Sequence, residues 1–169
     1  MKKDNWIPII FMLTFTLSFI FAGLSTLATN MNVFMLGIVL ILFIIIGIIF
    51  DMIGVAVLSC EEGAFHARAS KKIAGSKECI RLIKNANKTS SICNDVIGDI
   101  CGIVSGTISA SLVVLLWNTP LIAIISTAIL SSLTVGGKAI GKKIAIKKAE
   151  SIVFIVGKII NKLSFTNKN

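Results

Sequence analysis

Apolar residues are gathered into four long runs, which are separated by short polar turns or by longer basic segments. The runs cover residues 6–28, 33–58, 90–116 and 121–135. Each of the first three exceeds the roughly 20 residues that a helix needs to cross the hydrocarbon core of a bilayer. The whole chain contains only two prolines, so little interrupts helix formation. We therefore predict an all-α, polytopic membrane protein with about four transmembrane helices, forming one membrane domain over residues 1–169.

Positive charges divide the chain into two sides. All 17 Lys and Arg residues lie among the first three residues, in residues 68–88 or in residues 138–168, whereas the turns at 29–32 and 117–120 contain none. Cytoplasmic loops of membrane proteins are enriched in Lys and Arg. The pattern predicts a multi-pass protein of the plasma (cell) membrane with both termini and residues 60–90 in the cytoplasm. This segregation accounts for the net charge of +9, and we expect no nucleic-acid partner.

The ends of the first and fourth runs leave alternatives open. The first run follows Met1-Lys2-Lys3 and ends in Thr26-Leu27-Ala28, as a cleaved signal peptide does. Its apolar core is longer than the usual 7–15 residues, so we favour a retained helix, with cleavage as the alternative. The fourth run is short, and we expect its helix to continue through Gly136 and Gly137 into the basic tail.

The basic segments have amphipathic patterns. Apolar residues recur at three- and four-residue steps in two places, namely at Phe65, Ala69, Ile73, Ile80 and Ile83, and at Ala145, Ala149, Ile152, Val156, Ile159 and Leu163. Basic amphipathic helices beside membrane spans usually lie along an anionic inner leaflet. We therefore expect the lipid bilayer, with its anionic inner leaflet, to be their partner, and binding to another protein is the alternative.

The third run contains a ridge of small residues. Gly98, Gly102, Gly106 and Ala110 are spaced by four, so they fall on one face of a helix. Small residues at this spacing let a second helix approach closely inside lipid. We interpret Gly98, Gly102 and Gly106 as helix-packing positions.

Three carboxylates fall within the apolar runs. Asp95 and Asp99 are four residues apart on the third run, and Asp51 lies seven residues before the end of the second. A charged group inside the bilayer is costly, and it normally has a partner, a cavity or a function. Structural pairing and ion handling both remain open for these residues.

Enzyme and metal motifs are not found in the sequence. The four cysteines form no C-x-x-C pair, His66 is the only histidine, and there is no nucleophile–His arrangement or phosphate loop. We expect free thiols, no enzyme activity and no zinc or iron–sulfur site. An intramembrane hydrolase that pairs Asp51 with Asp95 or Asp99 is a distant alternative.

Three short motifs occur in order along residues 33–163. They are Glu62-Gly63-Ala64-Phe65, Ile97-Gly98-Asp99, and the stretch from Gly137 to Glu150 that reads G-K-A-I-G-K-K-I-A-I-K-K-A-E. These resemble E-x-A-[LF], I-G-N-N and G-E-I-x-P-K-x-L-A-x-x-x-A-E of the CNNM/CorC (cyclin M type) magnesium transporters. The resemblance implies three transmembrane helices followed by a juxtamembrane helix, a homodimer, and a divalent-cation (magnesium) transport lineage. Residues 6–28 would be an additional N-terminal transmembrane helix.

Departures from the family pattern fall on its ion site. A family Glu that helps to bind magnesium aligns with Lys138, a family Pro aligns with Gly141, and a family Asn aligns with Asp99. The family's regulatory CBS domains do not fit in the 19 residues after Glu150. We expect a divergent protein with an altered ion site and no cofactor, in which magnesium remains the only metal to consider. A non-transporting membrane scaffold or regulatory subunit is the alternative.

The altered ion site suggests a buried ion pair. A neutral residue has become acidic at Asp99 and an acidic residue has become basic at Lys138, so the resemblance implies that an ammonium group replaces the bound cation. We expect Lys138 to pair with Asp99 or with another intramembrane carboxylate, Asp95 or Asp51. The alternative is that Lys138 only begins the basic juxtamembrane helix and extends to the interface.

Overall fold

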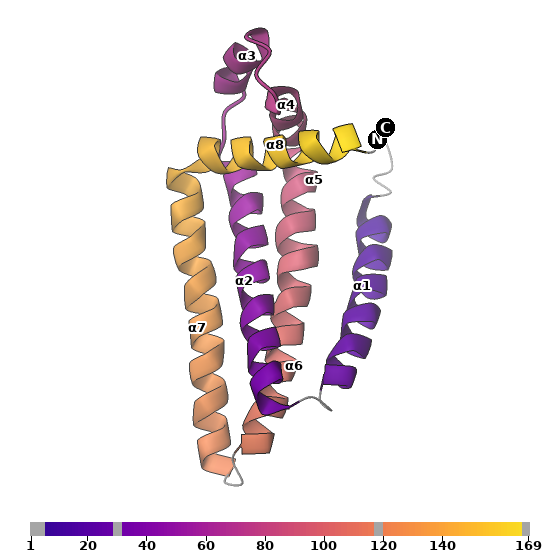
Figure 1. Ribbon diagram of the computed structural model, residues 1–169, viewed down its shortest axis with the longest axis vertical. Helices are drawn as coiled ribbons and strands as arrows, with labels where there is room; N and C mark the ends of the chain where they lie inside the picture. The colour runs from indigo at the N-terminus through magenta and orange to yellow at the C-terminus, as the bar shows by residue number, and fades with distance from the viewer. Residues whose placement is uncertain (1–5, 29–31, 117–119, 167–169) are drawn as a thin grey trace.

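The computed structural model describes residues 6–28, 32–116 and 120–166, and these residues are helical apart from short connections (Figure 1). Two proposed turns, at 29–32 and 117–120, therefore lie largely outside the described residues. The helices are α1 (Trp6–Ala28), α2 (Val33–Leu58), α3 (Gly63–Ser70), α4 (Ser76–Lys84), α5 (Ala86–Ser91), the π-helix η1 (Ile92–Gly98), α6 (Asp99–Leu116), α7 (Pro120–Lys147) and α8 (Ala149–Thr166). The predicted all-α fold is confirmed.

Among the described residues, three helical segments are long and apolar enough to cross a membrane. They are Val33–Leu58, the continuous stretch Ala86–Leu116 made of α5, η1 and α6, and Pro120–Lys147. The α1 helix contributes a shorter apolar stretch, Ile7–Gly23, which is not one of these three segments. Large aliphatic and aromatic side chains remain exposed along all of these segments, as expected where lipid replaces water around a helix bundle. This is the arrangement of a helical membrane protein.

The central helix of the bundle is α2, which packs against α5, η1, α6, α7 and α8. Its Leu36 and Leu40 are buried in one apolar cluster with residues of η1 and α6, namely Val96, Ile100, Val104 and Ile108. In contrast, α1 packs mainly on η1 and α6, and Phe21 also meets Phe43 of α2 edge-to-face, with ring centroids 5.7 Å apart. The bundle is therefore organised around α2, with α1 at its side.

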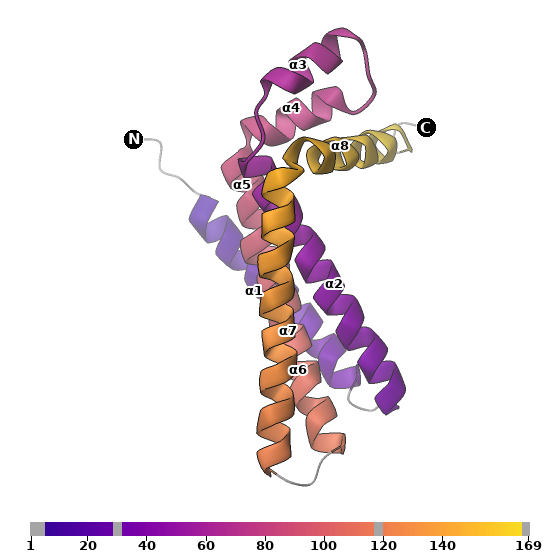
Figure 2. The same ribbon diagram turned by 90° about the vertical axis from the view of Figure 1, so that its left-hand side faces the viewer.

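One end of the bundle carries a small helical platform formed by α3, α4 and α8 (Figures 1 and 2). It has its own core, in which the end of α2 meets the other helices through Ala56, Val57, Cys60, Phe65, Cys79, Ala145, Ala149 and Val153. The predicted pattern through residues 65–83 is interrupted, because Ile73 lies in the connection between α3 and α4 and is exposed. Gly75 ends this connection, directly before α4, and its φ of 89° lies in the left-handed region that glycine adopts without steric cost.

The segment around the junction of α7 and α8 agrees with the predicted helix continuation and only in part with the predicted apolar stripe. As predicted, α7 continues without a break through Gly136 and Gly137 and ends at Lys147. The chain then turns at Lys148, and α8 runs across the end of the bundle (Figure 2). The buried face of α8 packs on α4 and the end of α2, and it contains Ala149, Val153 and Gly157. In contrast, Ile159 and Leu163 of the predicted apolar stripe remain exposed.

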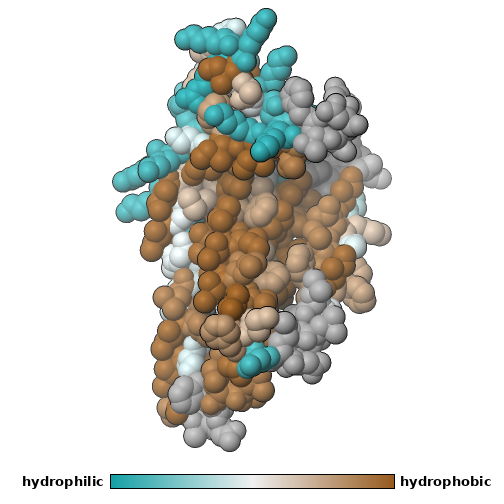
Figure 3. All heavy atoms as spheres, in the orientation of Figure 1, coloured by the Kyte–Doolittle hydropathy of each residue, from teal (hydrophilic) through white to brown (hydrophobic). Residues whose placement is uncertain are grey.

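Hydrophilic and hydrophobic residues are separated along the long axis (Figure 3). Hydrophilic side chains gather over the platform end, and the flanks of the bundle are almost continuously hydrophobic in this view. A slab of lipid around the flanks would leave the platform at one membrane surface.

Candidate functional site

A buried carboxylate occupies the inner part of the bundle, near the platform. Asp51 stands seven residues before the end of α2, which is about 10 Å along the helix. Its side chain is only 4% exposed, and its Oδ2 atom lies 3.5 Å from Nζ of Lys138 and 3.8 Å from Nζ of Lys142. The two lysines are four residues apart on α7, so they present their ammonium groups to the same side. Two positive charges thus meet one negative charge.

The backbone of η1 completes this cluster. The ammonium group of Lys138 donates a hydrogen bond of 3.0 Å to the carbonyl oxygen of Gly98. A Cβ atom at Gly98 would collide with Oδ1 of Asp51, so only glycine lets the carboxylate pack this closely. Gly98 is the last residue of η1, and π-helical turns rearrange the usual backbone hydrogen bonds and are frequent at functional sites. A helix-packing position of the sequence is therefore also a hydrogen-bond acceptor.

The structure pairs Lys138 with Asp51, which corrects the first choice of Asp99 as its partner. Asp95 and Asp99 are both exposed, whereas Gly98 next to them is buried. Successive residues of a helix point about 100° apart, so a carboxylate at position 99 faces away from the contact that position 98 makes. Of the candidate residues Asp51, Asp95, Asp99 and Lys138, the fold brings together only Asp51 and Lys138.

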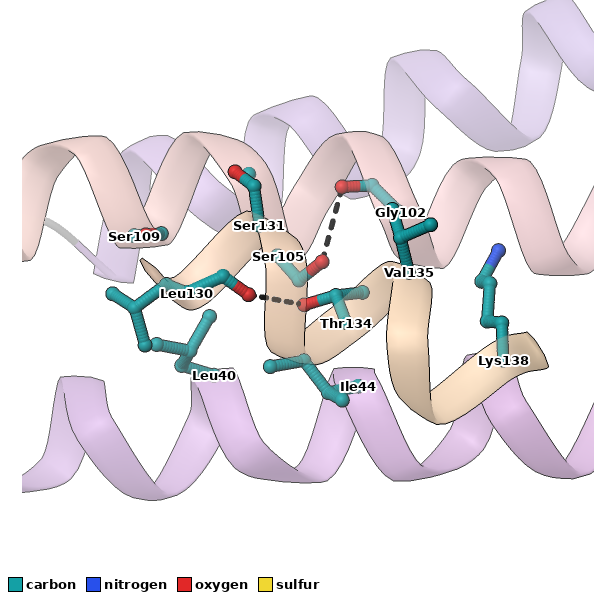
Figure 4. Close-up of a pocket in the computed structure, with 11 residues that line it drawn as sticks. Leu40, Ile44, Gly102, Ser105, Ser109, Leu130, Ser131, Thr134, Val135 and Lys138 are labelled. Atoms are coloured by element: carbon teal, nitrogen blue, oxygen red, sulfur yellow. Dashed lines mark hydrogen bonds between the residues drawn. The ribbon is translucent and has the colours of Figure 1, made fainter. Parts of the chain in front are cut away.

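Next to the ion pair lies a cavity of about 190 Å³ between α2, α6 and α7 (Figure 4). Lys138 stands at one end of the cavity and Ser109 lies toward the other, with Ser105 and Thr134 between them (Figure 4). The other lining residues are Leu40, Ile44, Gly102, Gly106, Leu130, Ser131 and Val135. The hydroxyl oxygen of Ser109 is buried and has no hydrogen-bond partner. The wall thus combines apolar side chains with four hydroxyl groups and one ammonium group.

The surroundings of the small-residue ridge differ along its length. Gly98 packs on Asp51, and a Cβ atom at Gly102 would lie 3.9 Å from Nζ of Lys138. A Cβ atom at Gly106 would meet nothing within 4 Å, so this part of the ridge is open. Gly98 and Gly102 lie beside the ion pair, whereas Gly106 lines the cavity and, like Ala110, is exposed and open to another helix.

Several contributing residues were missed in the sequence. Gly47 and Gly54 of α2 allow η1 and α6 to approach, since a Cβ atom at Gly47 would lie 3.1 Å from Cβ of Cys101 and one at Gly54 would collide with the Asn94 amide. Their seven-residue spacing, which repeats on one helix face, was the available signal. Lys142 was also overlooked as a partner of Asp51, although its i+4 spacing from Lys138 indicates a shared face.

The remaining candidate groups are metal-ligating side chains and the cysteine thiols. Within the described part of the chain, no group of three or more His, Cys, Asp and Glu side chains is placed to hold a metal ion. All four cysteines are buried free thiols. Burial raises the pKa of the Cys60 thiol, and Glu150 adds to the rise. The pKa of Cys79 is likewise raised by burial and by the nearby Glu78, and its thiol donates a 3.3 Å hydrogen bond to the Val153 carbonyl oxygen.

No protein-family model, no curated protein and no solved structure matches the chain.

Proposed function

We propose that the chain is an integral membrane protein of a divalent-cation (magnesium) transport lineage, in which a tethered ammonium group occupies the place of the transported ion. The observation that carries the proposal is the position of Lys138, whose ammonium group contacts Asp51 and the Gly98 carbonyl oxygen inside the bundle. Carboxylate and backbone carbonyl oxygens are also the ligands that magnesium and calcium use in proteins. A lysine side chain that reaches such oxygens competes directly with a metal ion.

The proposed topology is four crossings of the plasma membrane, with both termini in the cytoplasm. The start of α1 and the end of α8 lie at the end of the bundle that carries α3 and α4 (Figure 1). The basic residues of 68–88 lie in α3, α4, α5 and the connection between α3 and α4, and most of those of 138–168 lie in α8 and the last three turns of α7. The inside bias of Lys and Arg supports a cytoplasmic platform. In this topology α1, at 23 residues, is long enough to be the first crossing.

The proposed lineage is that of the CNNM/CorC transporters. The three segments α2, α5 to α6, and α7, followed by the transverse α8, occur in the order that the resemblance implies. Residues 33–163 would form the family-like region and α1 would be an addition. Lys138, at the position of a family magnesium ligand, supports a divergent ion site that has lost magnesium binding.

A second candidate function is a non-transporting scaffold or regulatory subunit. It is favoured by the platform, where Arg68 of α3 lies 5.0 Å above the Phe154 ring and 3.5 Å from the Glu150 carboxylate, both on α8. Lys158 of α8 lies 4.6 Å above the same ring. A basic platform of this kind would serve binding at the anionic inner leaflet without any transport step.

We also propose a homodimer that packs through the open half of the small-residue ridge. Gly106 and Ala110 are exposed on α6, and no atom of another described helix lies within 4 Å of a Cβ atom built at Gly106. Close packing at small residues drives helix association inside lipid. Chemical cross-linking should therefore trap a dimer of the unmodified protein and only monomer of Gly106→Leu. An equal amount of cross-linked dimer in the variant would exclude this face as the interface.

Magnesium titration of the purified protein tests the altered ion site. The unmodified protein should show no saturable heat of binding with magnesium, manganese or calcium, because the ammonium group of Lys138 fills the site. Lys138→Glu would place a second carboxylate beside Asp51 and should create saturable binding, while Lys143→Glu, at an exposed position of the same helix, is the matched control. Saturable magnesium binding or magnesium uptake by the unmodified protein would refute the altered site.

A further inference from the structure

We propose that the cavity between α2, α6 and α7 is hydrated and binds a small inorganic anion, such as chloride, beside the ammonium group of Lys138. This inference depends on the local geometry and charge of the cavity, and it does not depend on the magnesium-transport lineage proposed above. A failed magnesium titration would leave it untouched.

The ammonium group of Lys138 has a donor left for a ligand. It carries three N–H groups, of which one serves the Gly98 carbonyl oxygen at 3.0 Å and one faces Oδ2 of Asp51 at 3.5 Å. Lys138 also lines the cavity, and a Cβ atom at neighbouring Gly102 would be 3.9 Å from its Nζ atom. The third N–H group is therefore available to a molecule in the cavity.

The local charge favours an anion over a cation. Lys138 and Lys142 together carry two positive charges against the single carboxylate of Asp51, which leaves one positive charge in the cluster. Among the residues that line the cavity there is no carboxylate. Charge interactions are strong in a low-dielectric interior, and rings of Lys or Arg select anions in membrane pores. A small anion would balance the excess charge without leaving the bundle.

The hydroxyl groups can solvate such an anion. Ser105 and Thr134 now donate to the carbonyl oxygens of Gly102 and Leu130, at 3.0 and 2.9 Å, and a hydroxyl hydrogen can rotate toward a better acceptor. Buried hydroxyls rarely remain without a partner, so the unpaired oxygen of Ser109 indicates water in the cavity. The volume of about 190 Å³ has room for an ion and several waters, each of which takes about 30 Å³.

The primary experiment measures the melting temperature of the purified full chain in detergent. Sodium chloride, bromide or nitrate is exchanged for sodium gluconate at constant ionic strength, and inorganic phosphate serves as a larger anion. A site that binds chloride should raise the melting temperature by about 3 to 6 °C at ten times its dissociation constant. Equal melting temperatures in chloride and gluconate would overturn the proposal.

Paired variants locate the binding. Lys138→Met should abolish the chloride shift, because it removes the donor that lines the cavity. Lys142→Met removes one positive charge from the cluster but no group from the cavity wall, so it should reduce the shift without abolishing it. Thr134→Val preserves the shape of the side chain and should weaken chloride binding about tenfold. Thr127 lies two turns before Thr134 on α7, and its hydroxyl donates to the Ala123 carbonyl oxygen, so Thr127→Val should not weaken binding. A chloride shift that persists in both Lys138→Met and Thr134→Val would place the anion elsewhere and refute the assignment.

Direct observation covers the case in which Lys138→Met fails to fold. Crystals of the unmodified protein grown in bromide should give an anomalous peak between Lys138 and Thr134. Ordered waters with no bromide at this position would show that the cavity is hydrated but does not bind anions.

Discussion

Removing the buried carboxylate of Asp51 is the perturbation that best tests the structure. Its side chain is 4% exposed and lies within 4 Å of two ammonium groups, which come from a helix far away in the sequence. Asp51→Asn keeps the shape of the side chain but removes its charge. We expect a large loss of stability, because Lys138 would then be left inside the bundle without a counter-charge.

The magnitude follows from the surroundings of each partner. Breaking a buried ion pair by removing one member typically costs about 3–5 kcal/mol. Asp51→Asn should fall near the lower end, at about 3 kcal/mol, because the Gly98 carbonyl oxygen still accepts from Lys138. Lys138→Met should cost less, about 2 kcal/mol, because Lys142 remains 3.8 Å from the carboxylate. These losses are a large share of the roughly 5–15 kcal/mol that stabilise a typical protein.

A double-mutant cycle measures the pair directly. Melting temperatures or reversible unfolding in mixed micelles would be recorded for Asp51→Asn, Lys138→Met and the double variant. For a chain of this length, 3 kcal/mol corresponds to a fall of about 6–12 °C. The double variant should be more stable than the sum of the two single losses implies, with a coupling energy of about 1–3 kcal/mol. Asp99→Asn is the matched control, and since Asp99 is exposed it should change stability by less than about 0.5 kcal/mol.

Two results would refute the ion pair. Strictly additive losses in the double variant would mean that Asp51 and Lys138 do not interact. A loss for Asp99→Asn as large as that for Asp51→Asn would restore the pairing that the sequence first indicated.

Three further predictions address the platform, the thiols and the topology. Gly157→Ala should lower stability by about 1–3 kcal/mol, since its Cβ atom would meet Cys79 Sγ and lie 2.7 Å from the Gly75 carbonyl oxygen, whereas Gly63→Ala has nothing within 4 Å and should be neutral in the same melting assay. With the other cysteines replaced by Ala, Cys79 should be alkylated with a pH midpoint above the usual value of about 8.5, because burial disfavours its thiolate, and a midpoint at or below that value would contradict the burial. The raised pKa in the fold also means that stability should decline as pH rises above the pKa of the unfolded thiol. Cysteines introduced at Asn30 and Asn118 of a Cys-free chain should react with an impermeant maleimide from outside intact cells, and reaction of Lys77→Cys instead would invert the topology.

Hydrophobic periodicity and charge were enough to predict the helical class. Long apolar runs form helices in a membrane because every backbone polar group must find its partner within the segment, and this requirement is local. For the same reason the continuation of α7 through Gly136 and Gly137 was predictable. The sequence also identified Asp51 as a candidate, since a charge in an apolar run is costly wherever the helix packs. Lys138 became a candidate through the family resemblance, in which it takes the position of an acidic ligand.

The pairing of these candidates was decided by the tertiary structure. Asp51 and Lys138 are 87 residues apart, and their contact depends on the rotation of α2, η1 and α7 about their axes, which spacing along one helix does not determine. A single residue step from the end of η1 to the start of α6 separates the buried Gly98 from the exposed carboxylate of Asp99. The close approach that sets this rotation comes from glycines on two different helices, Gly47 and Gly54 on α2 and Gly98 on η1. The cavity next to Lys138 exists only because three helices meet, so no single stretch of sequence encodes it.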